Sequence, residues 1–244
     1  MPVSKKNNLK TLDRVLSRAG VASRAEARRW IAEGRVRVNG KTVQAPDTWV
    51  DPAHDRMTID GRPLRESSKV YLLFYKPKGY LTTSKDPEGR LTIYDLIDEK
   101  TRLIPVGRLD QDTSGLLLLT NDNDFSDYVS SPASHVPKTY LVKASKLLTD
   151  ADLERLRGGV ELSDGPTRPA IVERIRDSEK YTFFEITITE GRNRQVRRMV
   201  EALNAKVLKL VRTRIGEIKI GDLQIGKTRL LTPAEITSLR RKHS

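Results

Sequence analysis

Apolar residues near the start of the chain recur at the spacing of two short helices. The first helix is indicated by Leu12, Val15, Leu16 and Ala19, and Gly20 is a typical residue to end it. The second helix begins with a capping box formed by Ser23 and Glu26, whose side chains pair with each other's backbone amides. Its apolar positions, Ala27 and Ile31, lead to a second glycine stop at Gly34. The pattern therefore predicts two consecutive helices that both end at glycine.

A strand pattern follows these helices. Residue types alternate in RVRVNGKTV, and the Asn39-Gly40 pair within it is typical of the tight turn of a β-hairpin. A further turn is expected at Asp60-Gly61, and the charged segment 65–69 is typical of an exit into a linker. The sequence thus predicts a small helix–helix–hairpin domain over residues 9–66 and a larger domain over residues 67–244.

The larger domain is richer in strand patterns. Period-two or continuous apolar runs are found in VYLLFY, KTYLVKA, RPAIVERI, YTFFEITITE, LKLVRTRIG and IKIGDL. Capping signals at Thr149 and Thr232 begin two helices, and a third is expected in NRQVRRMVEAL. Because strands and helices do not alternate strictly, we expect an α+β fold, with helices flanking a mixed, largely antiparallel sheet.

The helix in NRQVRRMVEAL has two contrasting sides. Val196, Val200 and Leu203 form its apolar stripe. The opposite side is expected to carry Arg194, Arg197, Arg198 and Glu201. Taken alone, such arginines are typical of a solvated helix face.

The charge balance narrows the class of partner. The formal net charge is +13, which favours a polyanion such as nucleic acid or an acidic membrane surface. Residues 1–66 hold 14 Lys and Arg against 8 Asp and Glu, so this quarter of the chain carries nearly half of the net charge. A basic excess indicates the kind of partner, but it does not indicate catalysis.

The absence of cysteine excludes disulfides, thiolate zinc sites, iron–sulfur clusters and cysteine nucleophiles. The imidazoles of His54, His135 and His243 are too few and too scattered for a histidine-rich metal site. The N-terminal sequence MPVSKKNNLK lacks the apolar core of a secretory signal, and the run GLLLL at 115–119 is too short to span a bilayer. We therefore expect a cytoplasmic protein without a membrane partner.

Three arginines of the second helix, Arg24, Arg28 and Arg29, lie close together on its surface. An amphipathic helix with a solvated basic side would explain them by itself. The hairpin that follows changes this interpretation, because DRVLSRAGVASRAEARRWIAEGRVRVNGKTV resembles the RNA-binding domain first known from small-subunit ribosomal protein four. The resemblance covers about fifty residues and implies that these arginines contact the phosphates of structured RNA.

The segment VGRLDQDTSGLLLLTND carries the strongest candidate for chemistry. Asp110 lies in a loop just ahead of an apolar strand, and such a strand can hold a catalytic group rigidly. A calcium loop is disfavoured because Asn121 stands at its twelfth position and a strand follows. The residues alone leave two interpretations open: a paired-carboxylate site of Asp110 and Asp112, or a turn stabilised by aspartates. Gly107 and Gly115 are expected to let the loop bend.

The segment GRLDQDTSGLLLLTND is similar to the signature of the RsuA/RluB-type ribosomal RNA pseudouridine synthases. Further matches are KPKGYLTTSKDPEGRLTIYDLI, KTYLV, EGRNRQVRRM and LVRTRIGEIKIGDLQIG. They occur in the family's order and, with the N-terminal domain, cover essentially the whole chain. The resemblance implies isomerisation of a uridine to pseudouridine without a metal or cofactor.

The resemblance also implies roles for individual residues. Asp110 matches the catalytic aspartate, Arg197 the arginine that pairs with it, and Tyr140 the tyrosine that lies against the target base. We expect Arg108 to fill the space of the flipped nucleotide or to grip a phosphate. Further RNA contacts are expected at four other basic residues: Lys76, Lys78, Arg194 and Arg198. Whether Asp110 acts as a nucleophile or as a base does not follow from the sequence.

Three functional hypotheses remain to be compared. The first is a monomeric pseudouridine synthase acting on ribosomal RNA or a pre-ribosomal particle. The upstream KDPEGR and the C-terminal LVRTRIGEI favour large-subunit (23S) RNA, whereas KTYLV and TRPA are similar to the branch that modifies small-subunit (16S) RNA. The second is a non-catalytic ribosome-assembly factor, which would not need an acidic residue where phosphate lies. The third is a nuclease or glycosylase, and for phosphodiester cleavage the chain lacks the expected metal ligands or histidine.

Overall fold

The computed structural model describes residues 9–65, 67–84, 86–99 and 101–241. The N-terminal segment examined for a signal lies mostly outside these residues, as do Glu66 of the expected linker and His243. By contacts the chain divides into two compact units. Unit 1 consists of the chain up to Val70 and two short later segments, which end at Leu103 and Asn123. Unit 2 contains most of the remaining chain. The predicted domain limits of 9–66 and 67–244 stay a prediction.

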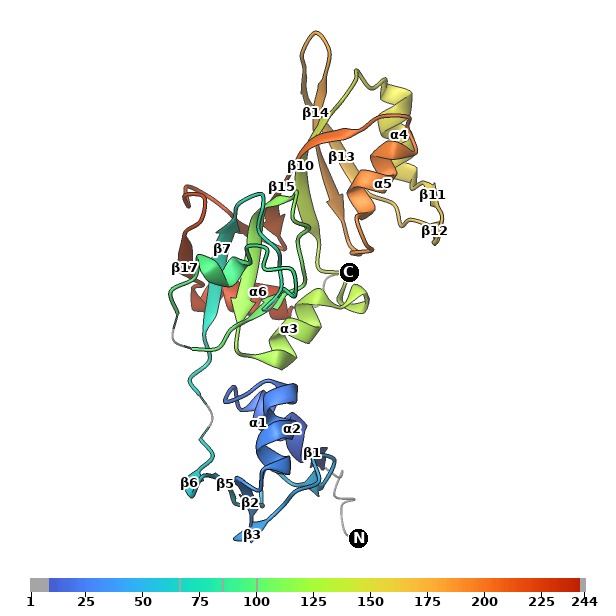
Figure 1. The fold of residues 1–244 in the computed structure, drawn as a ribbon. Helices are drawn as coiled ribbons and strands as arrows, with labels where there is room; N and C mark the ends of the chain where they lie inside the picture. Colours follow the sequence, from blue (N-terminus) through green and yellow to red (C-terminus); the bar gives the residue numbers. More distant parts are fainter. Residues whose placement is uncertain (1–8, 66, 85, 100, 242–244) are drawn as a thin grey trace. The chain divides into compact units, whose positions relative to one another are not determined.

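Unit 1 contains the predicted helix–helix–hairpin arrangement (Figure 1). Helix α1 spans Leu12–Arg18 and α2 spans Arg24–Ala32, and the capping box of Ser23 with Glu26 is present. Strand β2 (Val36–Val38) pairs with β3 (Lys41–Thr42) through a turn in which Asn39 and Gly40 have positive φ. Strand β2 also pairs with β5 (Met57–Ile59), which continues to β6 (Arg62–Pro63). The short strands β1 (Lys10–Thr11) and β4 (Trp49–Val50) pair separately.

A buried carboxylate ties the two helices of unit 1 together. Asp13 is fully buried and accepts hydrogen bonds from Thr11 Oγ1 at 2.6 Å, Arg24 Nη2 at 2.9 Å and Arg28 Nε at 2.9 Å. Burial by itself would raise the pKa of this carboxyl, but the hydrogen bonds outweigh it and hold the pKa far below its usual range. Two of the three arginines expected to bind RNA therefore also have a structural partner.

Replacing Asp13 with Asn should lower the free energy of unfolding of unit 1 by about 2 kcal/mol at neutral pH. Fully buried pairs cost more, but both guanidinium groups here are about half exposed. Because the pKa of Asp13 is lowered in the folded state, its contribution is present above the unfolded pKa of about 4 and is lost as the pH falls below it. The difference between the two proteins should therefore shrink in acid.

Denaturation followed by tryptophan fluorescence would measure this difference. The chain has two tryptophans, Trp30 and Trp49, and both lie in unit 1. Asp47→Asn is the matched control, since Asp47 is exposed and forms no hydrogen bond or ion pair with the residues that the structure describes. Equal unfolding of the Asp13 and Asp47 variants at pH 7 would contradict the prediction.

A nine-stranded mixed sheet forms the framework of unit 2. The strand order is β13-β14-β10-β15-β9-β7-β17, with β16 beside β15 and β8 beside β9. The bounds are β7 Tyr71–Lys76, β8 Ile104–Val106, β9 Ser114–Thr120, β10 Lys138–Ala144, β13 Ile171–Asp177, β14 Thr182–Ile188, β15 Val207–Ile215, β16 Ile218–Lys219 and β17 Thr228–Leu230. Among the described pairings of this sheet, only β9 with β15 is parallel. The predicted α+β class with a largely antiparallel sheet is confirmed.

The described part of unit 2 contains four α-helices in addition to the sheet, and Figure 1 shows their places. They are α3 (Asn123–Ser130), α4 (Asp150–Gly158), α5 (Gln195–Glu201) and α6 (Pro233–Arg240), and two 3₁₀ turns lie at Ile93–Asp95 and Pro132–Ser134. The capping boxes predicted at Thr149 and Thr232 are present. Helices α3 and α6 contribute Phe125, Val129 and Leu239 to the apolar core over β7 and β9. Helix α3 was not among the elements predicted, and of the predicted strand IKIGDL only Ile218–Lys219 is formed.

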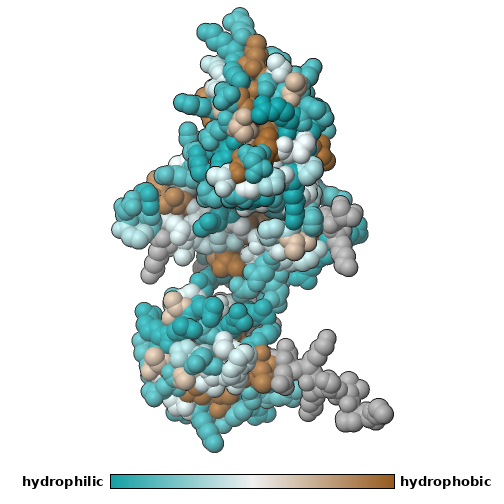
Figure 2. Space-filling model, turned by 90° about the vertical axis from the view of Figure 1, so that its right-hand side faces the viewer, coloured by the Kyte–Doolittle hydropathy of each residue, from teal (hydrophilic) through white to brown (hydrophobic). Residues whose placement is uncertain are grey.

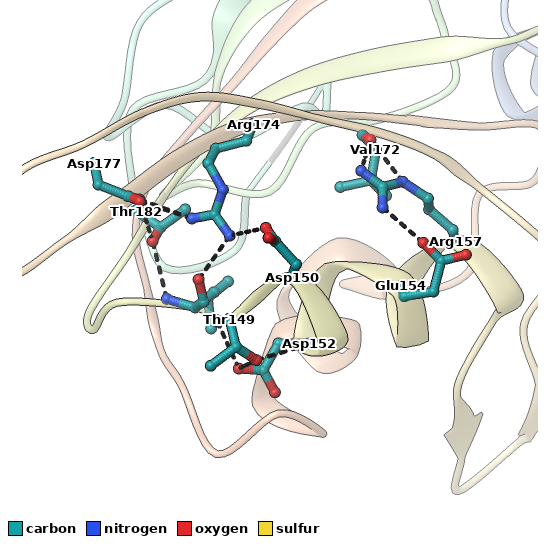
Figure 3. Close-up of polar contacts among 10 residues, drawn as sticks. Thr149, Asp150, Asp152, Glu154, Arg157, Val172, Arg174, Asp177 and Thr182 are labelled. Atoms are coloured by element: carbon teal, nitrogen blue, oxygen red, sulfur yellow. Dashed lines mark hydrogen bonds and ion pairs between the residues drawn. The ribbon is translucent and has the colours of Figure 1, made fainter.

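Two arginines attach helix α4 to strand β13, one on the helix and one on the strand (Figure 3). Arg157, on the helix, donates to the Val172 carbonyl from Nε at 3.0 Å and Nη2 at 2.8 Å. Arg174, on the strand, forms ion pairs with Asp150 and Asp177 and donates to the Leu148 carbonyl. A short hairpin, β11 (Glu161–Leu162) with β12 (Gly165–Pro166), follows the helix. These contacts attach α4 to β13, the strand at one end of the sheet order.

On the face drawn in Figure 2, hydrophilic residues cover most of the surface and apolar residues form small separate patches. Among the residues that the structure describes, no helix has the length and apolar character needed to cross a membrane.

Candidate active site

A cavity of about 280 Å³ in unit 2 opens at the loop between β8 and β9. Its polar lining includes Arg108 and Asp110 of the loop, Lys138 and Tyr140 of β10, Arg194 before α5 and Arg212 of β15. The volume is near the lower end for ligand cavities, about 300 Å³. As the sequence predicts, Asp110 lies in a loop directly ahead of the apolar strand β9, which spans Ser114–Thr120.

The parallel pairing of β9 and β15 brings this loop to the cavity. Gly115 of β9 is opposite Arg212 of β15, and Arg212 is in turn opposite Tyr140 of β10. A Cβ atom on Gly115 would lie 2.3 Å from the Arg212 carbonyl oxygen and 2.5 Å from its backbone nitrogen. The φ of +119° at Gly115 is also a conformation that favours glycine. Gly115 therefore serves the close approach of two strands and not only the bend of the loop.

The carboxylates of the loop face two arginines that precede or belong to α5. Arg194 Nη1 lies 3.7 Å from Asp110 Oδ2 and 3.2 Å from Asp112 Oδ1. Arg197 Nη2 lies 3.2 Å from Asp112 Oδ2. The expectation that Arg197 pairs with Asp110 is thus wrong in detail: the ion pair of Arg197 is with Asp112, and that of Asp110 is with Arg194. The side chain of Asp110 remains 35% exposed, so a molecule in the cavity can contact its carboxylate oxygens.

Arg197 is buried, although the helical pattern placed it on the polar side of its helix. Its Nη2 donates to the Asp112 carbonyl at 3.1 Å and to Thr113 Oγ1 at 3.3 Å, and its Nη1 donates to the Val207 carbonyl at 3.2 Å. Burial lowers the pKa of Arg197, and the charge of Asp112 opposes that shift. The contacts show that Arg197 fixes the backbone of the Asp110 loop.

Lys76 does not fit its predicted contact with phosphate. Its side chain is fully buried, and Nζ donates to the carbonyl oxygens of Pro77 at 3.1 Å, Asp110 at 3.0 Å and Thr113 at 2.9 Å. All three N–H donors are therefore used inside the protein. Burial lowers the pKa of Lys76 to about 8, although the negative charges of Asp110 and Asp112 act to raise it. Lys76 therefore stabilises the backbone of the loop that carries Asp110, and it has no N–H donor left for a phosphate.

The other predicted RNA contacts differ in how free their charges are. Arg108 and Lys78 are exposed, and neither forms a hydrogen bond or ion pair with the described part of the chain. Arg198 is turned toward Asp164, with Nη1 at 2.8 Å from Oδ1. Arg29 is 65% exposed and lies 3.8 Å from Glu33. Arg108 and Lys78 thus remain available to a polyanion. Arg29 and Arg198 each have a carboxylate partner, and the ion pair of Arg29 is the longer and more exposed of the two.

Two buried cationic residues of the cavity, Lys138 and Arg212, were not singled out from the sequence. Both lie within strands, at 8% and 3% exposure, where a pattern of alternation gives no reason to expect a charge beside a site. The KTYLV and LVRTRIG segments contain them, but the residue that drew attention there was Tyr140. Tyr140 is 9% exposed and lines the cavity. Among the described residues, no group of three or more His, Asp and Glu side chains could hold a metal ion.

Comparisons with known proteins agree with this geometry. A family model described as RNA pseudouridylate synthase matches residues 70–202, and an S4 domain model matches residues 10–56. The chain belongs to the RNA pseudouridylate synthase family. It is 40% identical over 235 residues to a protein of Bacillus subtilis (strain 168) named ribosomal large subunit pseudouridine synthase B, covering 95% of this chain and 96% of that protein.

A second relative from Aquifex aeolicus (strain VF5), an uncharacterized RNA pseudouridine synthase, is 41% identical over 93% of this chain and 92% of its own length. A crystal structure of a pseudouridylate synthase superposes with a TM-score of 0.69 and 32% identity, over 94% of this chain and 99% of that one. These matches confirm that the protein is an RNA pseudouridine synthase of the RsuA/RluB type and that its N-terminal part is an S4 domain.

Proposed function

We propose that this pseudouridine synthase isomerises one uridine of ribosomal RNA, in the large subunit (23S), with Asp110 as its catalytic carboxylate. The observation that carries the proposal is the position of Asp110 on the wall of a cavity that is also lined by Tyr140 and five basic residues. Two relatives named ribosomal large subunit pseudouridine synthase B, from Bacillus subtilis and Pseudomonas aeruginosa, support the choice of RNA. The substrate is free ribosomal RNA or a pre-ribosomal particle.

The reaction requires an extruded base, because the ring must leave the sugar and return by another atom. The bond between N1 and the ribose C1′ breaks, the ring turns, and C5 bonds to C1′. The proton on C5 is then lost and N1 gains one, so reactant and product are isomers. Asp110 acts on the ribose side of this exchange, and Tyr140 lies against the ring.

The charges around the loop suit these roles. Arg194 Nη1 lies 3.7 Å from Asp110 Oδ2, so a positive charge stands beside the side chain that faces the cavity. Arg197 acts through Asp112 and Thr113, holding the loop in the conformation that presents Asp110 to the cavity. Arg108 is exposed at the same cavity and takes the place of the flipped nucleotide or binds an adjacent phosphate. The domain over residues 9–66 binds structured RNA, and the domain over 67–244 carries catalysis; the enzyme works as a cytoplasmic monomer.

Mapping pseudouridines in both ribosomal RNAs, from cells with and without the gene, tests the proposal. We expect one position of 23S RNA to remain uridine in the deletion strain and to be restored by the wild-type gene. Restoration must fail with Asp110→Asn. Loss of a position in 16S RNA would reassign the subunit, and no change in either RNA would refute the ribosomal substrate.

Arg29→Gln should weaken RNA binding and reduce its dependence on salt. One lost phosphate contact lowers the slope of log affinity against log salt by about 0.9 on a duplex. Arg29 is the suitable residue because its side chain is 65% exposed, whereas Arg24 and Arg28 hold the buried Asp13. Filter binding over a range of salt would measure the slope. The exposed Lys219, changed to Gln, is the matched control, and equal slopes for both variants would contradict the prediction.

A further inference from the structure

Three buried cationic side chains lie at this site, Lys138 and Arg212 in the cavity lining and Lys76 against the loop that carries Asp110. No carboxylate forms an ion pair with any of them among the residues that the structure describes. Lys76, Lys138 and Arg212 are 0%, 8% and 3% exposed. Buried charges are ordinarily paired, since an unpaired charge loses its hydration without compensation. The carbonyl oxygens around Lys76 use all of its donors. Lys138 and Arg212 are different.

Arg212 retains unused hydrogen-bonding capacity. Its Nε donates to the Leu116 carbonyl at 2.7 Å, but the buried Nη2 has no partner in the described structure. Lys138 Nζ donates to the Val136 carbonyl at 2.9 Å, which accounts for one of its three donors. Both residues line the cavity that contains Asp110. An orphaned guanidinium nitrogen and a partly used ammonium in one cavity point to a ligand that supplies oxygen acceptors.

The two cations also influence each other electrostatically. Burial lowers the pKa of Lys138 to about 8, and the positive charge of Arg212 contributes to that shift. Two like charges in one buried wall repel each other. An occupant that carries negative charge would relieve this repulsion, whereas a neutral occupant would relieve only the missing hydrogen bond.

The register of the strands indicates which part of a substrate reaches these residues. Arg212 is opposite Tyr140 on one side and Gly115 on the other, so it belongs to the wall formed by the strands. Asp110 belongs to the loop ahead of β9. If Asp110 faces the sugar and Tyr140 the ring, as the proposed function requires, the neighbour of Tyr140 meets the base. A phosphate fits this wall less well, since the same small cavity contains a carboxylate.

We propose that Arg212, assisted by Lys138, binds the carbonyl oxygens of the target uracil and stabilises the ring as an anion while it is detached from the ribose. This assignment rests on the proposed function. When the N1–C1′ bond breaks, its electron pair stays on the ring and is shared by N1 and the carbonyl oxygens. The pair is used again when C5 bonds to C1′, after which C5 loses its proton and N1 gains one. The cations thus act where charge develops, as hydrogen-bond donors of oxyanion sites do.

Single-turnover kinetics of the full-length enzyme would test this role. The probe is ribosomal RNA from cells lacking the gene, compared with a transcript of the same RNA made with 5-fluorouridine. Fluorine withdraws electrons from the ring, so the fluorinated base leaves more easily as an anion. Because C5 then carries fluorine in place of the proton that must be lost, the reaction on this RNA cannot end in pseudouridine. The rate constant compared on both RNAs is therefore that of N1–C1′ cleavage, followed as loss of the N-linked nucleoside at the target position. For Arg212→Gln we expect the rate constant on ordinary RNA to fall about 100-fold or more, with RNA affinity unchanged within about 3-fold. The deficit relative to wild type should be at least about 10-fold smaller on the fluorinated RNA.

Arg214→Gln is the matched control. Arg214 lies two residues along the same strand, donates from Nε to Thr139 Oγ1 at 3.3 Å, and does not line the cavity. Its rate should stay within about 3-fold of wild type on both RNAs. Lys138→Met provides a second test: its rate constant should fall less than that of Arg212→Gln, and its deficit should also be smaller on the fluorinated RNA. If circular dichroism shows that Arg212→Gln does not fold, the test rests on Lys138→Met.

The outcomes separate the two proposals. An equal deficit on both RNAs, or a normal rate for both variants, would show that the cations play a structural role only and would overturn the assignment while leaving the proposed function intact. A wild-type enzyme without activity on either ribosomal RNA would overturn the proposed function, and this assignment with it.

Discussion

Asp110→Asn is expected to abolish pseudouridine formation, by about 10⁴-fold or more, while RNA affinity stays within a few-fold of wild type. Asparagine matches the shape of aspartate but can neither attack the sugar nor accept its proton at neutral pH. Affinity should persist because the arginines and lysines that face the phosphates are unchanged. The measurement is single-turnover conversion of ribosomal RNA from the deletion strain, together with a binding isotherm at the same salt concentration.

Asp112→Asn is the matched comparison for Asp110, since the two residues share one loop and one arginine. Asp112 pairs with Arg194 and Arg197, and the structure gives it a part in positioning the loop. We therefore expect a partial loss of activity, accompanied by lower thermal stability. Normal turnover by Asp110→Asn would end the assignment of Asp110, and complete loss only in Asp112→Asn would exchange the roles of the two carboxylates.

Gly115→Ala should reduce activity by at least about 100-fold and lower the stability of unit 2 by several kcal/mol. The added Cβ would lie 2.3 Å from the carbonyl oxygen of Arg212 and 2.5 Å from its backbone nitrogen. Both are backbone atoms, which cannot move away as a flexible side chain can. The strands β9 and β15 would have to separate, which displaces Asp110 from the wall that holds Tyr140 and Arg212. Thermal unfolding followed by circular dichroism and single-turnover kinetics would measure the two effects.

Gly107→Ala separates the effect of close packing from that of loop conformation. Gly107 has a φ of +71°, but a Cβ there would meet only Ser130 Cβ, at 4.0 Å. We expect a cost of about 1–2 kcal/mol from the left-handed backbone alone. If Gly107→Ala were as damaging as Gly115→Ala, the bend of the loop and not the approach of the strands would be the decisive requirement.

Features that depend on short stretches of chain could be predicted from the amino-acid sequence. Capping boxes at Ser23, Thr149 and Thr232 involve residues three apart, so the helices that they begin could be located without any knowledge of the fold. Strand patterns with clear alternation were equally local, as in β14. The segment around Asp110, read with its companion segments in order, was specific enough to indicate the family.

Elements with weak local signals escaped sequence interpretation. Helix α3 has the sequence NDFSDYVS, in which Phe125 and Val129 are the buried apolar residues, and its stability comes from packing against β7 and β9. Strand β17 has three residues and is defined by its pairing with β7. Such elements are stabilised by segments that are distant in the chain, so their own amino-acid sequence gives little indication of a helix or strand.

Which charged residues belong to the site depends on the three-dimensional fold. Lys76 resembles a surface lysine in KPKG, yet the antiparallel pairing of β7 with β9 places it under the loop, where three carbonyl oxygens hold it. Arg197 lies on the polar side of its helix by periodicity, but the Asp110 loop covers that side and buries it. Arg212 reaches the cavity because Gly115 lets two strands meet. Burial and partnership of a charge depend on chain segments up to about a hundred residues apart, as in the bond from Arg212 to Leu116, and no local pattern records them.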